Sequence, residues 1–305
     1  MKHLVTFRLV DAIARTGSIR AAAEEAAQTP SAVQRRLQGY EEELGFEIFE
    51  RSARGVRLNA AGELVIQHVR EMLSEDARLK SRIADLSGVR RGHVAIGCSQ
   101  ALIPYFLPRR IARYQAQFPN VTFNVSVLEY GSAFQALESF AVDLVLVFDG
   151  VAVPEEYEVR LAAPQRLTAV MAANHPLAAF ATVRLRQCCE YPLALPARGF
   201  GGRRMLDRAM FGKSFARPPI LESNSFEYLK AHVAATEAIT FQIQIGGPER
   251  GDEQGLVSRE IDNRDVTEGT LFLGQKRNRT LPVAASRFVE QISKALSERY
   301  HLDDA

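Results

Sequence analysis

The sequence is poor in cysteine, which excludes a fold held together by a disulfide framework. It contains three cysteines, Cys98, Cys188 and Cys189, in 305 residues, and it has no tryptophan. The adjacent Cys188 and Cys189 are poor partners for each other. We therefore expect buried or idle thiols, with redox sensing or metal binding as the alternatives.

Long apolar runs are also missing. No segment approaches the ~18 consecutive apolar residues that a membrane helix needs, and the first residues lack the pattern of a signal peptide. We therefore expect a cytoplasmic protein with no membrane partner. The chain is 47% hydrophobic and 24% charged, the composition of a globular protein, and its length indicates about two or three domains.

The chain as a whole has almost no excess charge, but its first part carries what excess there is. The formal net charge is +2. Residues 1–92 hold 15 Lys and Arg against 13 Asp and Glu, whereas residues 93–305 hold 23 of each kind. Five arginines of the first part form a local group: Arg35, Arg36, Arg51, Arg54 and Arg57. Because phosphate neutralisation is local, such a group counts for more than the net charge.

Residues 18–44 predict two short helices with a tight break between them. The first helix covers residues 18–25, and the break covers residues 26–29. Thr29 can cap the second helix by accepting a backbone N–H, and Pro30 suits its first position, where an N–H has no partner to lose.

The second helix has an apolar face and a polar face. Val33, Leu37 and Tyr40 recur at helical spacing and should be buried. The other face carries polar and cationic side chains, namely Ser31, Gln34, Arg35 and Gln38. A helix-turn-helix needs such side chains at the start of its second helix to reach base edges and phosphates. An ordinary amphipathic helix pair is the alternative interpretation.

The residues that follow favour the DNA-binding interpretation. Residues 46–59 predict a short hairpin wing with three arginines spaced along it. Seven motifs then occur in order: Phe7-x-x-Val10, Gly17-Ser18, Ala21-Ala22, Thr29-x-Ser31-Ala32-Val33, Glu41-x-x-Leu44-Gly45, Phe49-x-Arg51 and Arg57-Leu58-x-x-Ala61-Gly62. Together they resemble the N-terminal winged helix-turn-helix of LysR-type transcriptional regulators. Gln34, Tyr40 and Asn59 depart from the family, which usually has Ser, Leu and Thr there.

The resemblance implies a DNA-binding domain over residues 1–59 and double-stranded DNA as a partner. Combined with the polar face and the arginine group, it predicts nine DNA-contacting residues. These are Thr29, Ser31, Gln34, Arg35, Arg36, Gln38, Arg51, Arg54 and Arg57.

Residues 60–87 predict one long helix without proline. One heptad seam consists of Val65, Met72, Leu79 and Leu86, and the other consists of Val69, Asp76 and Ile83. Such a repeat commonly pairs with a second copy of itself, and a helix packed on its own domain is the alternative. In the family this element is the linker helix that dimerises, so the resemblance assigns residues 60–91 to the linker and hinge.

Beyond residue 92 strands alternate with helices. We expect strands at residues 93–98, 121–129 and 143–148, with helices at residues 99–118 and 132–140 between them. Further elements are expected at residues 161–173, 205–211, 226–235, 239–245, 270–274 and 284–296. This alternation predicts an α/β fold with a parallel sheet wound by helices.

This part resembles the effector-binding domain of LysR-type regulators, which has two α/β lobes of periplasmic-binding-protein type and a cleft between them. The implied domain covers residues 92–305, with lobe I at 92–161 and 268–305 and lobe II at 162–267. The chain would cross between lobes near Arg160 and Val266. The resemblance is weaker after residue 236, where residues 237–246 replace the family's frequent Gly-x-Gly-x-x-x-Leu-Pro pattern.

A ligand in such a fold lies at the carboxyl ends of strands, beside helix N-termini. Residues 98–100, 148–150 and 223–225 occupy such places, and Glu227 stands three residues after Asn224, the spacing of a capping box. Hydroxyl-capped helix N-termini favour a small anion such as a carboxylate, to which Arg203 or Arg204 would add a cation, although Asp149 argues against a second negative charge. Simple helix capping is the alternative role.

The predicted effector-binding residues come partly from these strand ends and partly from family positions that line the cleft. They are Ser99, Gln100, Phe148, Phe200, Gly201, Ser223, Asn224 and Ser225.

Catalytic interpretations find little support. The six histidines are scattered without metal-ligand spacing, and residues 199–202 lack the Lys-Ser/Thr or complete GxGxxG of a phosphate loop. We therefore predict no enzyme, no cofactor and no metal site, and a ligand-responsive LysR-type DNA-binding regulator that acts as a homodimer or homotetramer. RNA polymerase would be a partner if it activates transcription. An architectural DNA-binding protein with a vestigial cleft, or a solute-binding protein, is the alternative.

Overall fold

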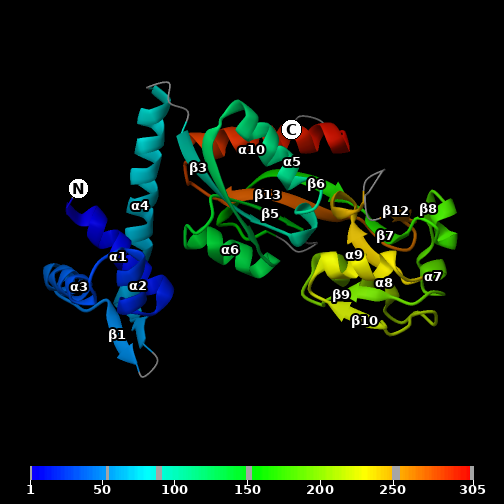
Figure 1. Ribbon diagram of the computed structural model, residues 1–305, viewed down its shortest axis with the longest axis horizontal. Coiled ribbons are helices and arrows are strands. Elements are labelled where there is room, and N and C mark those ends of the chain that lie inside the picture. The colour runs from blue at the N-terminus through cyan, green and yellow to red at the C-terminus, as the bar shows by residue number, and fades with distance from the viewer. Residues whose placement is uncertain (1, 53–54, 87–90, 149–152, 249–254, 303–305) are drawn as a thin grey trace. The chain divides into compact units, whose positions relative to one another are not determined.

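The computed structural model describes residues 2–52, 55–86, 91–148, 153–248 and 255–302. The chain divides into two compact units, Met1–Gly88 and Val89–Ala305 (Figure 1). No helix in the described ranges is long and apolar enough to cross a membrane.

The first unit begins with three helices, α1 (Lys2–Thr16), α2 (Ile19–Glu25) and α3 (Pro30–Leu44). The cap expected at Thr29 forms, and Ser18 supplies a second cap, because the hydroxyl oxygens of both residues accept backbone N–H groups of the helices that follow. The N–H groups at a helix start have no partner inside the helix, so these caps fix where α2 and α3 begin.

The wing is a two-stranded antiparallel hairpin of β1 (Phe49–Ser52) and β2 (Gly55–Leu58). It is attached to the α1–α2 turn, because Val56 donates its N–H to the carbonyl oxygen of Gly17 at 3.0 Å. A Cβ on Gly55 would lie 2.4 Å from that same oxygen, and Gly55 has a φ of +125°. Only glycine fits this position without displacing the turn.

The long helix α4 (Ala60–Leu86) packs its first half on its own unit. Ile66 and Val69 are buried in the core beneath α1, and Arg70 forms an ion pair with Asp11 at 2.7 Å. A Cβ on Gly62 would lie 2.0 Å from the carbonyl oxygen of Ile48, so this glycine permits the close approach of the wing.

The predicted seam of α4 therefore divides into two parts. Val69 is fully buried and Val65 is partly buried within the same unit, so these two are used locally, as the alternative interpretation expected. Met72, Leu79 and Ile83 are 38%, 57% and 54% exposed. Three apolar seam residues of α4 thus keep a large part of their side-chain surface exposed.

Among its described residues, the second unit contains a five-stranded sheet, a four-stranded sheet and a separate pair of strands. The first has the strand order β4-β3-β5-β13-β6. Its strands are β3 (Arg91–Cys98), β4 (Asn120–Val127), β5 (Leu144–Phe148), β6 (Tyr157–Gln165) and β13 (Gly269–Lys276). Its helices are α5 (Leu107–Gln117), α6 (Tyr130–Glu138) and α10 (Val283–Tyr300). The sheet is mixed rather than parallel, because β13 runs antiparallel to both β5 and β6.

The expected helix at residues 99–118 is wrong in its first half. The chain instead forms the 3-10 helix η1 (Gln100–Leu102), a turn, and then α5. Pro104 lies in that turn and has no N–H to continue a helix, which accounts for the break. The short η1 leaves Ser99 and Gln100 at the end of β3 instead of inside a long helix.

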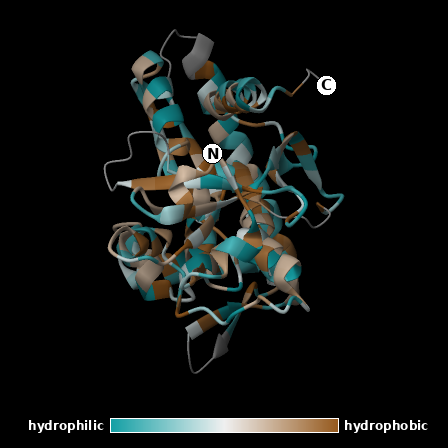
Figure 2. Ribbon diagram, turned by 90° about the vertical axis from the view of Figure 1, so that its right-hand side faces the viewer, coloured by the Kyte–Doolittle hydropathy of each residue, from teal (hydrophilic) through white to brown (hydrophobic). Residues whose placement is uncertain are grey.

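The second sheet has the order β11-β7-β12-β8, and a separate parallel pair is formed by β9 and β10. The strands are β7 (Leu167–Ala172), β8 (Thr182–Val183), β9 (Ala194–Pro196), β10 (Leu221–Ser223), β11 (Thr240–Ile243) and β12 (Leu256–Ile261). The helices are η2 (Pro176–Ala179), α7 (Leu185–Cys188), α8 (Gly201–Met210), α9 (Phe226–Ala234) and η3 (Gln244–Gly246). Figure 2 shows that the helices combine hydrophilic and hydrophobic residues, as expected for helices that cover a sheet on one side.

The chain crosses from the first sheet to the second at Arg166, because β6 stays paired with β13 through Gln165. This crossover lies a few residues after the predicted Arg160. The Arg166 guanidinium joins the two crossing segments, with its Nε 2.7 Å from Glu268 and its Nη1 3.0 Å from Glu260.

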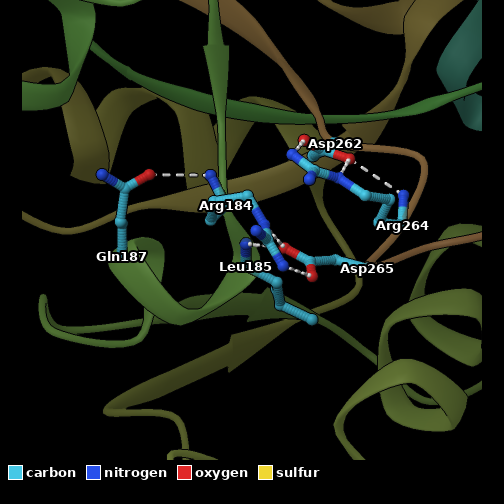
Figure 3. A network of polar contacts seen from close by, with 6 residues as sticks. All are labelled: Arg184, Leu185, Gln187, Asp262, Arg264 and Asp265. Carbon is cyan, nitrogen blue, oxygen red and sulfur yellow. Dashed lines mark hydrogen bonds and ion pairs between the residues drawn. The ribbon is translucent and has the colours of Figure 1, made fainter.

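The segment between β12 and β13 is tied to the second sheet by a group of ion pairs (Figure 3). Arg184 forms two hydrogen bonds with Asp265, at 2.8 and 2.6 Å, and the Leu185 N–H donates to the same carboxylate at 2.8 Å. Asp262 accepts from Arg264 on the same segment. The hydrogen bonds from Arg184 hold the pKa of Asp265 below its ordinary value.

Replacing Asp265 by Asn should lower the free energy of unfolding by about 1 kcal/mol near neutral pH. The neutral amide would bind the Arg184 guanidinium and the Leu185 N–H less strongly than the carboxylate does. A carboxylate with a depressed pKa stabilises the fold above its unfolded pKa of about 3.9 and loses this effect as the pH falls through its folded pKa. The melting temperatures of the parent and Asp265→Asn should therefore converge in acid. Glu190→Gln, at an exposed position just after α7, is the control. A stability difference for Asp265→Asn that persists unchanged in acid would contradict the ion-pair assignment.

Candidate functional site

The second helix of the first unit, α3, presents one uncovered face. Val33 and Leu37 are buried at 0% and 5% exposure, and Tyr40 is also buried. The opposite side starts at Thr29, whose Oγ1 accepts from the Ala32 N–H at 3.3 Å and lies 3.2 Å from the Ser31 hydroxyl. The cap thus positions the first turn of this face.

Most predicted contact residues of α3 lie on that face. Ser31, Arg35, Arg36 and Gln38 are exposed, and Gln34 is partly buried at its edge. Within the described ranges, neither Arg35 nor Arg36 forms an ion pair. Their guanidinium groups are therefore available to an external anion, and phosphate is the anion that planar, always-charged groups bind well.

The wing supplies the remaining predicted cations. Arg57 is exposed on β2 and stands opposite Glu50 in the hairpin register. Arg51 stands on β1 opposite Val56. Arg54 lies outside the described residues.

In the second unit, the predicted effector residues come together where the two sheets meet. The Gln100 Oε1 on η1 accepts a hydrogen bond from the Phe226 N–H of α9 at 2.9 Å. The rings of Phe200 and Phe226 lie 4.9 Å apart between centroids. A Cβ on Gly201 would lie 2.6 Å from the carbonyl oxygen of Phe148, so α8 and β5 are in direct contact.

The start of α9 is capped by Ser225, not by Asn224. The Ser225 hydroxyl accepts from the Tyr228 N–H at 3.2 Å, and the Ser223 hydroxyl accepts from the Ser225 N–H at 3.1 Å. The predicted capping box with Glu227 is therefore wrong. Glu227 instead forms an ion pair with Lys230 at 2.7 Å.

Ser99 ends the strand β3 as predicted. Its N–H donates to the carbonyl oxygen of Leu146 at 2.9 Å, and its side chain is partly buried without a capping bond to η1. On the same side, the carboxylate of Glu129 lies 3.0 Å from the position that a Cβ of Gly199 would take. The meeting place therefore also holds an acidic group that the sequence analysis did not identify.

Arg203, one of the two predicted cations, is buried and bound to acceptors of the protein itself. It is 3% exposed, and its guanidinium binds the Pro196 carbonyl oxygen, Asp207 and Glu222 at 2.7, 2.8 and 2.8 Å. It thereby holds α8 against β9 and β10. Arg204 donates to the carbonyl oxygen of Gly199 at 2.8 Å.

A cation that the sequence analysis missed is Lys230 on α9. It is 4% exposed, its ammonium lies 4.8 Å from the centroid of the Tyr105 ring, and Glu227 neutralises it from the exposed side. A signal was present in the sequence, since Lys230 occupies the apolar spacing set by Phe226 and Val233. A lysine on the buried stripe of a helix needs a partner, which here comes from its own helix.

The three cysteines are free and buried. Burial raises the pKa of Cys98 to about 12 and also raises the pKa of Cys188 and Cys189. All three thiols are therefore protonated near neutral pH, which agrees with the expected idle state. In the described ranges no group of three or more His, Cys, Asp or Glu side chains could hold a metal ion.

The contact between α8 and β5 can be tested with two adjacent glycines. Gly201→Ala should destabilise the protein by roughly 1–3 kcal/mol, because its Cβ would meet the Phe148 backbone and ring at 2.6 and 2.7 Å. Gly202→Ala is the control, since its Cβ would have only ordinary contacts at 3.6 and 3.7 Å. It should be neutral or stabilising by up to about 1 kcal/mol. Equal melting temperatures for the two variants would contradict the close approach.

Comparison with known proteins covers both units. Residues 4–63 match the family described as bacterial regulatory helix-turn-helix protein, lysR family. Residues 87–297 match the LysR substrate binding domain.

Relatives and solved structures extend over nearly the whole chain. The transcriptional regulator CysB of Burkholderia cenocepacia is 27% identical and covers 98% of this chain and 100% of its own. The activator CmpR of Synechocystis sp. is 25% identical over 94% of this chain and 93% of its own. A full-length OxyR variant from Pseudomonas aeruginosa has a similar fold (TM-score 0.67, 18% identity, 96% and 94% coverage). So does CbnR in complex with its target DNA (TM-score 0.62, 17% identity, 96% and 99% coverage). The chain belongs to the LysR family of transcriptional regulators.

Proposed function

We propose that the protein binds operator DNA through α3 and the wing, and that a small molecule bound between the two sheets of its second unit controls this binding. The observation that carries the proposal is the division of α3 into a buried apolar face and an uncovered polar face with two unpaired arginines, in the part of the chain that the structure describes. The activity is binding rather than catalysis, and it would take place in the cytoplasm, where the chromosome lies.

The residues of α3 divide into two roles. Ser31, Gln34 and Arg35 start the helix and would read base edges in the major groove. Arg36 and the wing arginines would contact phosphates. Such contacts position the winged helix-turn-helix, called the head below, on DNA without reading its sequence. The fold shared with a regulator solved in complex with its target DNA supports this arrangement.

We infer that residues 1–59 form the DNA-binding domain, residues 60–91 the linker, and residues 92–305 the effector domain. The stripe of Met72, Leu79 and Ile83 on α4 is apolar and exposed, so it would pair with a second copy of the chain. Pairing of two heads gives a homodimer, and two dimers give a homotetramer. If the outcome is activation, RNA polymerase is a further partner.

Control by the effector would follow from differential binding. A ligand that binds one arrangement of the two lobes more tightly shifts the population toward it. Because the lobes are joined to the heads through α4, such a shift would change how paired heads sit on DNA.

The proposed reading of bases is tested by comparing Gln34→Ala with Arg36→Ala. The first should change the preferred bases, since a good base contact discriminates by roughly 1–3 kcal/mol. The second should weaken binding to all duplexes and flatten the salt dependence by about one unit. Selection of binding sites from random DNA and titration at several salt concentrations measure the two effects. An unchanged selected motif for Gln34→Ala would exclude this residue from base reading.

The proposed pairing of α4 is tested by placing Lys at both Met72 and Leu79. Like charges in the stripe should prevent pairing, so the protein should sediment as a smaller species and lose a two-half-site operator through loss of effective concentration. Gln67→Lys with Ala77→Lys adds the same charge at exposed positions on the opposite side of the helix and should preserve both properties. If the stripe variant keeps its size and operator affinity, the stripe does not form the dimer.

A further inference from the structure

The chain just before β1 is held by residues on both sides of the hairpin. Glu41, in the last turn of α3, accepts the Ile48 N–H at 2.7 Å and the Phe49 N–H at 3.4 Å with the same carboxylate oxygen. The carbonyl oxygen of Ile48 accepts the N–H of Asn59 at 3.1 Å. Ile48 itself is fully buried. Both backbone polar groups of Ile48 are therefore bonded, one to α3 and the other to the residue before α4.

Asn59 uses both ends of its side-chain amide. Its Nδ2 donates to the carbonyl oxygen of Glu47 at 2.7 Å, and its Oδ1 accepts the Gly62 N–H in the first turn of α4 at 2.7 Å. A threonine, the usual residue of the family here, has one hydroxyl in place of this amide, so a single oxygen would have to make both bonds. In this chain the departure from the family links the base of the hairpin to α4 through two separate atoms.

The place of Glu41 is unfavourable for a carboxylate that has no partner. The helix α3 ends at Leu44, and the C-terminus of a helix carries a partial negative charge. Glu42 and Glu43 in the same turn are exposed to water, whereas Glu41 is partly buried. The two backbone N–H groups supply its partners, since hydrogen bonds to a carboxylate are charge-assisted. The contact with the hairpin, and not the stability of α3, therefore accounts for Glu41.

These bonds fix the hairpin relative to the helix that would read DNA. Arg57 lies on β2, two residues before Asn59, and its side chain is exposed. The same strand is tied at Val56 to the carbonyl oxygen of Gly17, so each strand of the hairpin has an anchor outside it. Contacts to phosphates and to base edges must be made together on one duplex. The position of the hairpin relative to α3 thus matters for DNA binding.

We propose that Glu41 and Asn59 are positioning residues for DNA binding. Glu41 fixes the base of the wing to α3, and Asn59 fixes it to the start of α4. Neither residue touches DNA, and both act through the wing arginines, which meet phosphates while α3 lies in the major groove. The inference rests on the proposed function, and it adds two residues that the DNA-contacting set does not include.

The experiment uses the full chain and compares Glu41→Leu with Glu41→Gln. Both substitutions remove the same charge at similar volume, but only glutamine keeps an oxygen that accepts the Ile48 N–H. Glu41→Leu should flatten the salt dependence of operator binding by about one unit, because a wing arginine no longer reaches its phosphate. Glu41→Gln should restore most of the parent's slope. Glu42→Leu removes a charge from the same turn at an exposed position and is the control, which should keep the parent's slope.

Double variants separate positioning from a general loss of stability. In an Arg57→Ala background Glu41→Leu should flatten the slope less than in the parent, because part of the same contact is already lost. In an Arg36→Ala background it should keep its full effect, since Arg36 lies on α3. Asn59→Ser keeps an oxygen that can cap α4 but lacks the amide that bonds Glu47, and it should behave like Glu41→Leu. Equal flattening in the two backgrounds would overturn the positioning role.

Amide hydrogen exchange tests the contact itself without DNA. The Ile48 N–H should exchange roughly tenfold faster in Glu41→Leu than in Glu41→Gln. Equal exchange in the two variants, together with the parent's salt slope in Glu41→Leu, would overturn the proposal. A parent protein that binds no duplex would contradict the proposed function instead, and faster exchange in Glu41→Leu would still support the tie between Glu41 and the wing.

Discussion

The return of β13 into the first sheet is the constraint on which the effector unit depends. After β12 of the second sheet the chain returns to the first sheet as β13, which lies between β5 and β6 and runs antiparallel to both. Without it, the buried strand β5 would lose its backbone partners on one side, which is costly in an apolar interior. Because β6 leaves the sheet beside the point where β13 enters, the two crossing segments lie together, and Arg166 joins them.

Most of the buried cations serve this architecture and not a ligand. Arg203 holds α8 on β9 and β10 through three acceptors. Arg279 is 8% exposed and forms an ion pair with Asp143 at 2.7 Å, and Asp143 also accepts the N–H of Ala95. A buried charge needs such partners, since an unpaired one is costly. Lys230 differs because its partner Glu227 is exposed and a small cavity lies beside it.

The sequence predicted the first unit more accurately than the second. The cap at Thr29, the buried face of α3 and the hairpin all follow from residues a few positions apart. The second unit depends on pairings across about a hundred residues, so the antiparallel β13 was not predicted, and the crossover at Arg166 lies a few residues after the expected Arg160. Gln100, Phe148, Phe200, Gly201 and Ser225 were expected in one cleft and do lie together, whereas Asn224 is not the cap and Arg203 is not free.

What the sequence determined by itself is the identity and polarity of the local elements. Apolar spacing, a Thr-Pro helix start and a left-handed Gly45 act within one or two turns, so their outcome does not depend on distant residues. Only the tertiary structure decided that Val69 is buried against its own head, that Gln100 reaches the N-terminus of α9, and that Lys230 lies under Tyr105. These contacts join residues that are far apart in the chain, and they form because sheet register and helix packing bring those residues together.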